Sequence, residues 1–194
     1  MPQTNQFHIR PARSAGDDAQ FIMAAFDSTI PYLRSIGAAG MWGEKPFSEK
    51  DIDGFEQETV ESVHNSERED DPLNILIAEA DRGQRPPTRV ALAMIREDSL
   101  PAYITEREEM KPEVDQAKQF IFLEVVISDY GTTPLHKGAG AALIEAAKRR
   151  GREKNKDTLY YEGRGFEKVG DFSFARANGE IWPGTLFRMR LSGP

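Results

Sequence analysis

A short loop with two glycines is the first stretch of this sequence whose residue types could do chemistry. Residues 135–143 read LHKGAGAAL and follow the apolar run QFIFLEVVI at 119–127. Gly138 and Gly140 have no Cβ, so consecutive backbone N–H groups could point outward and meet a phosphate at the start of a helix. His136 and Lys137 could add a donor or a positive charge. The same glycines could instead serve an ordinary strand-to-helix turn, and the loop lacks the longer spacing of a P-loop or a dinucleotide-binding loop.

A second candidate is a pair of phenols beside a glycine-rich turn. Residues 159–170 read LYYEGRGFEKVG, so Tyr160 and Tyr161 precede a Gly-X-Gly-Phe sequence and a further strand-like run. The question is which of the two phenols has a chemical role, and whether they are true neighbours in the fold.

The elements that would position these residues follow from hydrophobic periodicity. Strand-like runs occupy residues 7–12, 73–80, 90–95, 119–127, 166–175 and 185–191, and helical patterns occupy 17–35, 48–63, 104–110 and 140–153. Pro31 should break or kink the first helix, and Ser48 with Asp51 resembles a capping box for the second. The run at 119–127 should form a central strand covered on both faces. The pattern predicts a single α/β domain, residues 1–194, with a mixed sheet.

Composition limits the classes of function. The chain has 194 residues and a net charge of −7, which disfavours a nucleic-acid partner. It has no cysteine, and its three histidines, His8, His64 and His136, show no ligand spacing, so we expect no metal. The N-terminus lacks an apolar signal region, and no run approaches the roughly 20 apolar residues of a membrane span. We therefore expect a cytoplasmic protein without a membrane partner.

The loop and its flanking elements resemble the acyl-CoA-binding core of the GNAT superfamily of N-acyltransferases. The loop signature of that superfamily is Arg/Gln-x-x-Gly-x-Gly/Ala. The match here comprises Leu135, His136, Lys137, Gly138, Ala139 and Gly140. Leu135 stands where Arg or Gln is usual, but the main contacts there are made by backbone amides. The resemblance extends over residues 6–191 and implies an α/β fold with a mixed, mostly antiparallel central sheet flanked by helices.

A second motif resembles the same superfamily. Its members carry a Tyr-Glu-x-x-Gly-Phe segment near the C-terminus, followed by a strand. The matching residues here are Tyr161, Glu162, Gly163, Arg164, Gly165 and Phe166, and a strand is predicted directly afterwards. The two motifs therefore occur in the order that the superfamily shows.

The resemblance also reveals a shortage of residues. In the superfamily, the loop and its helix are followed by another strand and another helix, which ends at the Tyr-Glu-x-x-Gly-Phe turn. If the first helix ends near Arg152, only residues 153–165 remain before Phe166. A strand of about 5 residues and a helix of about 8 to 11 do not fit with their connections. We favour a missing segment between Tyr160, in a strand, and Tyr161, near a helix end; the alternative is a natural deletion that leaves one short helix and no strand.

The resemblance implies direct transfer of an acetyl (acyl) group from acetyl-CoA to a primary amine. The amides of Lys137, Gly138, Ala139, Gly140 and Ala141 would hold the pyrophosphate of the cofactor. The backbone of Val125, Val126 and Ile127 would align the pantetheine like an extra strand. A backbone N–H of Val126 or Ile127 would donate to the thioester oxygen as it gains charge.

Two side chains are candidates for proton transfer. Glu124 is the one charge within 119–127, so it could accept the proton of the attacking amine; alternatively it faces outward at a strand end or forms an ion pair. Tyr161 matches the position of the acid that protonates the departing thiolate in the superfamily; alternatively it is a packing tyrosine. Tyr160 would belong to a strand and be structural.

The acceptor site is expected in the region that joins the first two helices, as in the superfamily. This region runs from Tyr32 to Phe47; Trp42 and Phe47 could form an apolar wall in it, and Glu44 could meet an amine. The alternative is a loop that its aromatic residues anchor to the core.

These observations predict an N-acetyltransferase that acts on an amine of a small molecule or a peptide. One alternative is a non-catalytic acyl-CoA-binding domain that has lost its acid or base. Another is a different phosphate-ligand fold that shares only the loop. Whether the chain forms a homodimer is left open.

Overall fold

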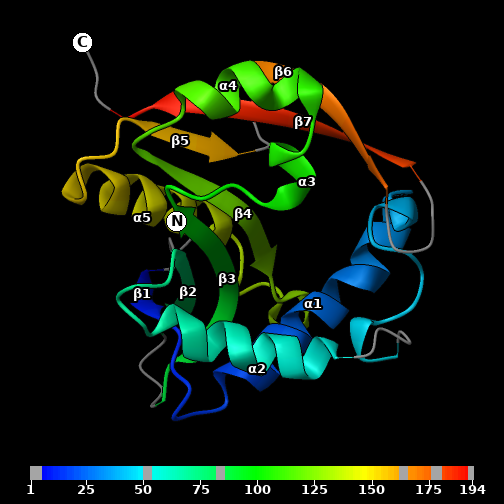
Figure 1. Cartoon of the computed structure of the whole chain (residues 1–194). Coiled ribbons are helices and arrows are strands. Elements are labelled where there is room, and N and C mark those ends of the chain that lie inside the picture. Colours follow the sequence, from blue (N-terminus) through cyan, green and yellow to red (C-terminus); the bar gives the residue numbers. More distant parts are fainter. Residues whose placement is uncertain (1–5, 50–53, 82–85, 162–165, 176–180, 192–194) are drawn as a thin grey trace, which may run out of the picture. The chain divides into compact units, whose positions relative to one another are not determined.

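The structure is a computed structural model, and it describes residues 6–49, 54–81, 86–161, 166–175 and 181–191 (Figure 1). The strands are β1 (Phe7–Pro11), β2 (Leu73–Ala80), β3 (Thr88–Glu97), β4 (Phe120–Ser128), β5 (Thr158–Tyr161), β6 (Glu167–Ala175) and β7 (Ile181–Arg190). The α-helices are α1 (Asp18–Ser35), α2 (Phe55–Ser66), α3 (Ala102–Thr105), α4 (Lys111–Gln116) and α5 (Ala139–Glu153). Short 3-10 helices are η1 (Ala39–Met41), η2 (Phe47–Glu49), η3 (Glu108–Met110) and η4 (Tyr130–Thr132).

The strands form one mixed sheet in the order β1-β2-β3-β4-β5-β7-β6. Strands β1 and β2 are antiparallel, as are β5 and β7, and β6 and β7. Strands β4 and β5 are parallel, since the crossover through α5 joins them. The predicted mixed, mostly antiparallel sheet flanked by helices is confirmed.

The chain divides into two compact units, which are described separately. Unit 1 comprises residues 1–94 and 125–146, and unit 2 comprises residues 95–124 and 147–194. Strands β3 and β4 and helix α5 each contribute residues to both units. The single domain expected over residues 1–194 stays a prediction.

The core of unit 1 is built by α1, α2 and the first strands. Phe21, Ile22 and Ala25 recur at helical spacing on α1 and are buried together with residues of β2, among them Ile75 and Ile77. Helix α1 continues through Pro31 to Ser35, so a break there is wrong, and a kink at Pro31 stays a prediction. Proline removes only one hydrogen bond of the helix, and the burial of neighbouring apolar side chains holds the last turn in place.

The predicted capping box at Ser48 is also wrong. Helix α2 begins at Phe55, and Gly54 precedes it with a positive φ of 102°. The Ser48 hydroxyl instead donates to Asp27 of α1 at 2.6 Å, and the same carboxylate accepts from the backbone N–H of Phe47 at 2.5 Å. Asp27 therefore ties the segment before α2 to α1.

A buried carboxylate fixes the start of α1. Asp18 is only 2% exposed, and it accepts hydrogen bonds from Arg10, Arg89 and the backbone N–H of Arg13. Burial alone would raise the pKa of Asp18, but the bonds from Arg10, Arg89 and Arg13 outweigh it and lower the pKa to about 2. Arg10 also donates to Glu79 of β2 at 2.6 Å, so the ion pairs join β1, β2, β3 and α1 within unit 1.

In unit 2, one face of the strands is covered by residues that precede β4. Phe120, Phe122, Tyr160, Phe172 and Leu186 form this apolar face, and they pack with Ile104, Met110 and Val114. The covering residues lie on α3, η3 and α4, which Figure 1 shows beside β5, β6 and β7. The sequence predicted a single short helix at 104–110, and three short helices occupy 102–116 instead.

The other face of unit 2 is covered by the last turns of α5. A Cβ placed on Gly151 would lie 2.4 Å from Leu191 Cδ1 and 3.3 Å from Ile121 Cγ1, so this helix approaches the strands closely. Ile121 and Leu159 are fully buried on this side. In unit 2, β4 is therefore covered on both faces, as its apolar sequence predicted.

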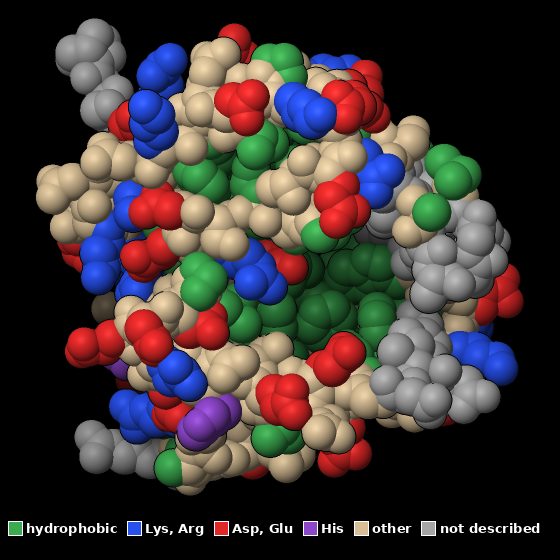
Figure 2. Space-filling model, viewed as in Figure 1, with side chains coloured by type: hydrophobic (Ala, Val, Ile, Leu, Met, Phe, Trp, Pro, Cys, Tyr) green, Lys and Arg blue, Asp and Glu red, His purple; other side chains and the backbone are tan. Residues whose placement is uncertain are grey.

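The surface is of mixed charge. Figure 2 shows acidic and basic side chains interspersed over the visible face, in keeping with a chain that has 32 acidic and 25 basic residues. Among the described residues, no helix is both long enough and apolar enough to cross a membrane.

We predict an acid-sensitive contribution of Asp18 to stability. Since the folded chain binds this proton only near pH 2 and the unfolded chain near 3.8, the free energy of unfolding should fall by about 2 kcal/mol from about pH 4 to about pH 2. Denaturant unfolding at several pH values should show that Asp18→Asn loses this contribution and is destabilised at pH 7. Asp70→Asn, which alters an exposed ion pair with Arg68, is the matched control. Parallel acid profiles of Asp18→Asn and the native chain would contradict the assignment.

Candidate functional site

The loop between β4 and α5 lies in unit 1 and is held by its own hydrogen bonds. The Asp129 backbone N–H donates to the Val90 carbonyl at 2.8 Å, and the Asp129 carboxylate accepts from Gly131 N–H at 2.9 Å. The backbone N–H of Tyr130 donates to Ser28 Oγ of α1 at 3.0 Å. These contacts fix the path of the chain from the end of β4 toward the glycines.

The backbone amides predicted to bind pyrophosphate fall into two groups. The N–H groups of Leu135, Lys137 and Ala139 donate to carbonyls within the loop, at 2.7, 3.2 and 2.9 Å. Within the described residues, no acceptor lies in hydrogen-bonding geometry to the N–H groups of Gly138, Gly140 or Ala141. Donors without partners in the first turn of a 15-residue helix are suited to an anion.

The two glycines of the loop serve different purposes. Gly138 has a φ of +93°, which side-chain-bearing residues rarely adopt, and a Cβ there would lie 3.5 Å from Phe7 Cε2. A Cβ on Gly140 would lie 3.6 Å from Val126 Cγ1, an ordinary contact distance. The backbone conformation therefore requires glycine at 138, whereas at 140 a Cβ would fit at ordinary contact distance from Val126.

The strand residues predicted to align pantetheine precede this loop in β4. Ile127 is buried in the core of unit 1, Val125 packs against that core, and Val126 faces Gly140. The parallel register of β4 with β5 covers Phe120–Phe122 and Thr158–Tyr160. The residues predicted to align pantetheine come later in β4 than this paired stretch; they are Val125, Val126 and Ile127.

Three aromatic rings pack beside the loop. Tyr32 stacks on Tyr130 with ring centroids 4.0 Å apart, and Tyr130 lies 5.0 Å from the ring of His136. Burial and a hydrogen bond with Tyr32 raise the pKa of Tyr130 to about 12. Burial lowers the pKa of His136, with Asp129 acting in the opposite direction, so this imidazole is neutral at pH 7. The structure thus brings Tyr32 and His136, both predicted from the sequence, together through Tyr130.

The sequence did not single out Tyr130. The only sequence feature that could have indicated Tyr130 is its place just after the strongest predicted strand. That place does not predict which rings it contacts. His136 Nδ1 is buried, and no described residue is a hydrogen-bond partner for it. The imidazole therefore adds neither charge nor an exposed Nδ1 to the loop.

Of the other residues predicted to form the acceptor site, two pack against aromatic side chains and one is exposed to solvent. Trp42 and Phe47 contact Phe26 of α1, with ring centroids 5.6 and 5.1 Å away, and Phe47 also contacts Phe55 of α2 at 5.1 Å. Glu44 is exposed, and its backbone carbonyl accepts from Arg34 at 2.8 Å. The contacts of Trp42 and Phe47 are those of the alternative, in which aromatic residues anchor the loop to the core.

Glu124, the predicted base, forms an ion pair in unit 2. Its Oε2 accepts from Arg96 Nε at 2.7 Å, and the carboxylate side chain is 24% exposed. An ion pair was one of the alternatives that the sequence left open. The bond engages one carboxylate oxygen.

The prediction of a missing segment between the two tyrosines is wrong for this structure. Tyr160 and Tyr161 occupy consecutive positions of β5 and pair with Arg188 and Phe187 of β7. Tyr161 is therefore not near a helix end, and its ring contacts Phe166 edge-on, with centroids 5.7 Å apart. The other four residues of the second motif, 162–165, lie outside the described residues.

The count of residues was sound, but its conclusion was not. Five positions, 162–166, separate Tyr161 from the start of β6 at Glu167, fewer than the about 8 residues of a two-turn helix. The strand after α5 is present and the helix after that strand has no room. Tyr160 is 3% exposed and belongs to a strand, which confirms its predicted structural role.

Comparison with solved structures identifies the fold. A putative phosphinothricin N-acetyltransferase matches at a TM-score of 0.58 and 16% identity, covering 97% of this chain and 100% of that chain. A putative GNAT-family acetyltransferase from Desulfovibrio desulfuricans matches at 0.58 and 12%, covering 96% and 100%. PaiA N-acetyltransferase from Thermoplasma acidophilum, in complex with coenzyme A, matches at 0.52 and 13%, covering 95% and 99%.

The chain therefore has the GNAT fold over nearly its whole length. No protein-family model and no curated protein sequence matches it. The alternative of a different phosphate-ligand fold that shares only the glycine loop is excluded.

We predict that Gly138→Val impairs the binding of coenzyme A. The valine must adopt a φ near +93° and adds methyl groups where an anion would approach the N–H groups. Calorimetric titration with coenzyme A should show a dissociation constant raised about tenfold or more, since hydrogen bonds to a charged group contribute about 1.5–3 kcal/mol each. Gly54→Val, at a φ of +102° before α2, carries similar backbone strain and serves as the control. Unchanged affinity in folded Gly138→Val would refute this function of the loop.

Proposed function

We propose that this protein is an N-acetyltransferase that transfers an acetyl group from acetyl-CoA to a primary amine of a small molecule or a peptide. The observation that carries the proposal is the set of N–H groups at Gly138, Gly140 and Ala141, which have no acceptor among the described residues and lie at the start of α5, after the loop that follows β4. The GNAT fold supports it, because the solved structures described above comprise two putative acetyltransferases and one N-acetyltransferase with coenzyme A bound.

Binding of the acyl donor would use backbone groups. The pyrophosphate would accept hydrogen bonds from the N–H groups of Gly138, Gly140 and Ala141, and the exposed Lys137 side chain would add positive charge. The pantetheine would lie along Val125, Val126 and Ile127 as an added strand does. A backbone N–H of Val126 or Ile127 would stabilise the thioester oxygen as it gains negative charge.

The reaction forms one bond and breaks one. The neutral amine attacks the thioester carbon, the C–N bond forms, and the tetrahedral intermediate collapses with cleavage of the C–S bond. An alkyl ammonium has a pKa near ~10.4, so its proton must be removed before attack. Glu124 would accept it, directly or through water, and Tyr161 would protonate the departing thiolate and recover its proton from water. The products are the acetylated amine and free coenzyme A.

The amine would be selected in unit 1. Tyr32 and Tyr130 form a stacked aromatic wall beside the glycine loop, and Glu44 supplies an exposed carboxylate in the predicted acceptor region. Cytoplasmic location and a homodimer remain predictions.

The function is tested by a screen for acetyl-CoA consumption across amine classes. Small polyamines, amino acids and peptide N-termini are offered separately, and the release of the free thiol is followed. At least one class should accelerate thiol release above the rate with water alone, and the acetylated amine should appear in equal amount. Coenzyme A binding without turnover of any amine would contradict the proposed reaction.

We predict that Tyr161→Phe lowers kcat by about 10²-fold, the lower end of general-acid effects, and leaves the KM for acetyl-CoA nearly unchanged. The substitution keeps the ring and removes only the proton donor. The neighbouring variant Tyr160→Phe is the matched control. It should retain turnover and lose about 1 kcal/mol of stability, because the Tyr160 hydroxyl donates to Glu113. If Tyr161→Phe has the kcat of the native chain, Tyr161 is a packing residue and not the general acid.

A second candidate is a non-catalytic acyl-CoA-binding domain. The ion pair of Glu124 with Arg96 favours it, because Arg96 already engages one oxygen of the carboxylate that would serve as the base. Alanine substitution of Glu124 and Tyr161 separates the two candidates. Loss of turnover with retained coenzyme A binding supports the enzyme, whereas absence of turnover in the native chain supports the binding domain.

A further inference from the structure

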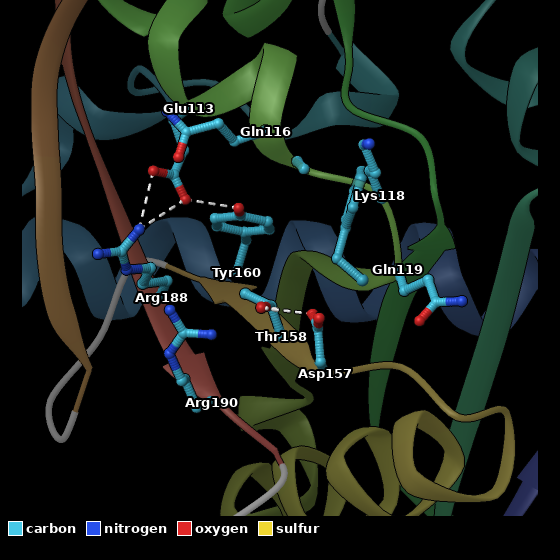
Figure 3. Close-up of a pocket in the computed structure, with 11 residues that line it drawn as sticks. Glu113, Gln116, Lys118, Gln119, Asp157, Thr158, Tyr160, Arg188 and Arg190 are labelled. Carbon is cyan, nitrogen blue, oxygen red and sulfur yellow. Dashed lines mark hydrogen bonds and ion pairs between the residues drawn. The ribbon is translucent and has the colours of Figure 1, made fainter.

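A cleft in unit 2 has no part in the proposed acetyl transfer. It has a volume of about 470 Å³, within the range of pockets that hold small molecules. Its walls come from the end of α4 and the segment before β4, from the start of β5 and from the end of β7 (Figure 3). Phe120, the first residue of β4, lines the cleft, whereas the glycine loop follows the last residue of that strand.

One acid and one base in this cleft neutralise each other. Arg188 Nη1 donates to both oxygens of Glu113, at 3.0 and 2.9 Å, and the Tyr160 hydroxyl donates to the same carboxylate at 2.6 Å. Burial, together with Glu113, raises the pKa of Tyr160, so this phenol stays neutral and keeps its proton. The Glu113 side chain is 14% exposed and is fully engaged by these bonds.

The neighbouring cation is not neutralised in this way. Arg190 lies two residues after Arg188 on β7, so both side chains project from the same face of the strand. Figure 3 shows both side chains among the residues that line the cleft. Within the described part of the chain, no carboxylate forms an ion pair with Arg190 or with Lys118, the third cation of the cleft wall.

The second carboxylate of the cleft is already engaged. Asp157 accepts a hydrogen bond from the Thr158 hydroxyl at 2.8 Å, and Thr158 is the cross-strand partner of Arg190. The wall thus holds three cations and two carboxylates and carries a net positive charge, although the whole chain carries a net charge of −7.

We propose that this cleft binds a small organic anion through a carboxylate or phosphate group held by the guanidinium of Arg190. A guanidinium presents a planar fork of N–H donors that matches both oxyanions, and Arg190 is the fork that has no partner among the described residues. The Gln116 and Gln119 amides supply further polar contacts, and Phe120 and Ala117 give the organic part of the ligand an apolar wall. Lys118 adds positive charge at the rim.

The proposal is tested by calorimetric titration of the full chain at low ionic strength, with citrate and with inorganic phosphate as separate probes. At least one probe should bind saturably, and the stronger of the two identifies the preferred oxyanion. Arg190→Gln should raise its dissociation constant about tenfold or more, because a charge-assisted hydrogen-bond pair is lost. Arg149→Gln removes an exposed charge on α5 and is the matched control, with unchanged affinity expected.

Two further variants make the outcome decisive. Arg190→Lys retains the charge without the fork and should bind more weakly than the native chain and more tightly than Arg190→Gln; it also replaces Arg190→Gln should the latter not fold. Gly138→Val should leave the affinity of the cleft unchanged, because the glycine loop is a separate site. Equal affinity in Arg190→Gln and the native chain, or no saturation up to about 10 mM, would overturn the proposal. Loss of binding in Gly138→Val alone would place the anion at the glycine loop and also overturn it.

Discussion

The apolar face on the strands of unit 2 has to be kept from water, and the arrangement of that unit follows from this requirement. Phe120, Phe122, Tyr160, Phe172 and Leu186 present this face from four strands. Each such side chain contributes about 1.5–3 kcal/mol when it is fully buried. The connection between β5 and β6 is too short to supply a covering helix. The cover comes instead from residues that precede β4, on α3, η3 and α4.

The hydrogen bonds and ion pairs of α3, η3 and α4 determine where these helices lie on the strands more than they stabilise the fold. Apolar contacts are tolerant of sliding, whereas the bonds of Glu113 to Arg188 and Tyr160 require one arrangement of α4 over β5 and β7. Breaking this partly buried network would leave a carboxylate without partners, which is costly. The same arrangement leaves the cleft open beside Arg190, because α4 ends at Gln116 and the chain turns away toward β4.

In unit 1 the corresponding constraint acts on the backbone of the glycine loop. Asp129 and the stack of Tyr130 on Tyr32 hold the loop before it reaches Gly138. The positive φ of Gly138 then starts α5 with its first N–H groups turned out of the loop. The first turn of α5 thus keeps donors that have no partner among the described residues, at a place where a bound anion would satisfy them.

The sequence by itself determined the elements whose signal is local. The strand at 73–80, the strand that includes 120–127 and the helix that ends at 153 were predicted nearly as the structure has them, because periodicity depends only on neighbouring residues. The order of strand, glycine loop and helix was also readable, and with it the GNAT fold. Predictions from local patterns were wrong where a side chain binds a residue far away in the sequence. Ser48, for example, donates a hydrogen bond to Asp27 and does not cap a helix.

Only the tertiary structure decided the contacts between residues far apart in the chain. Spacing could not reveal that Tyr160 meets Glu113, that Glu124 meets Arg96 or that Tyr130 stacks on Tyr32. The same limit explains the error at Tyr160 and Tyr161. The count of residues showed correctly that a helix does not fit there, but it could not show that an upstream segment covers the exposed strands. Which segment covers the strands depends on the burial of apolar surface in three dimensions, and this cannot be predicted from the order of residues along the chain.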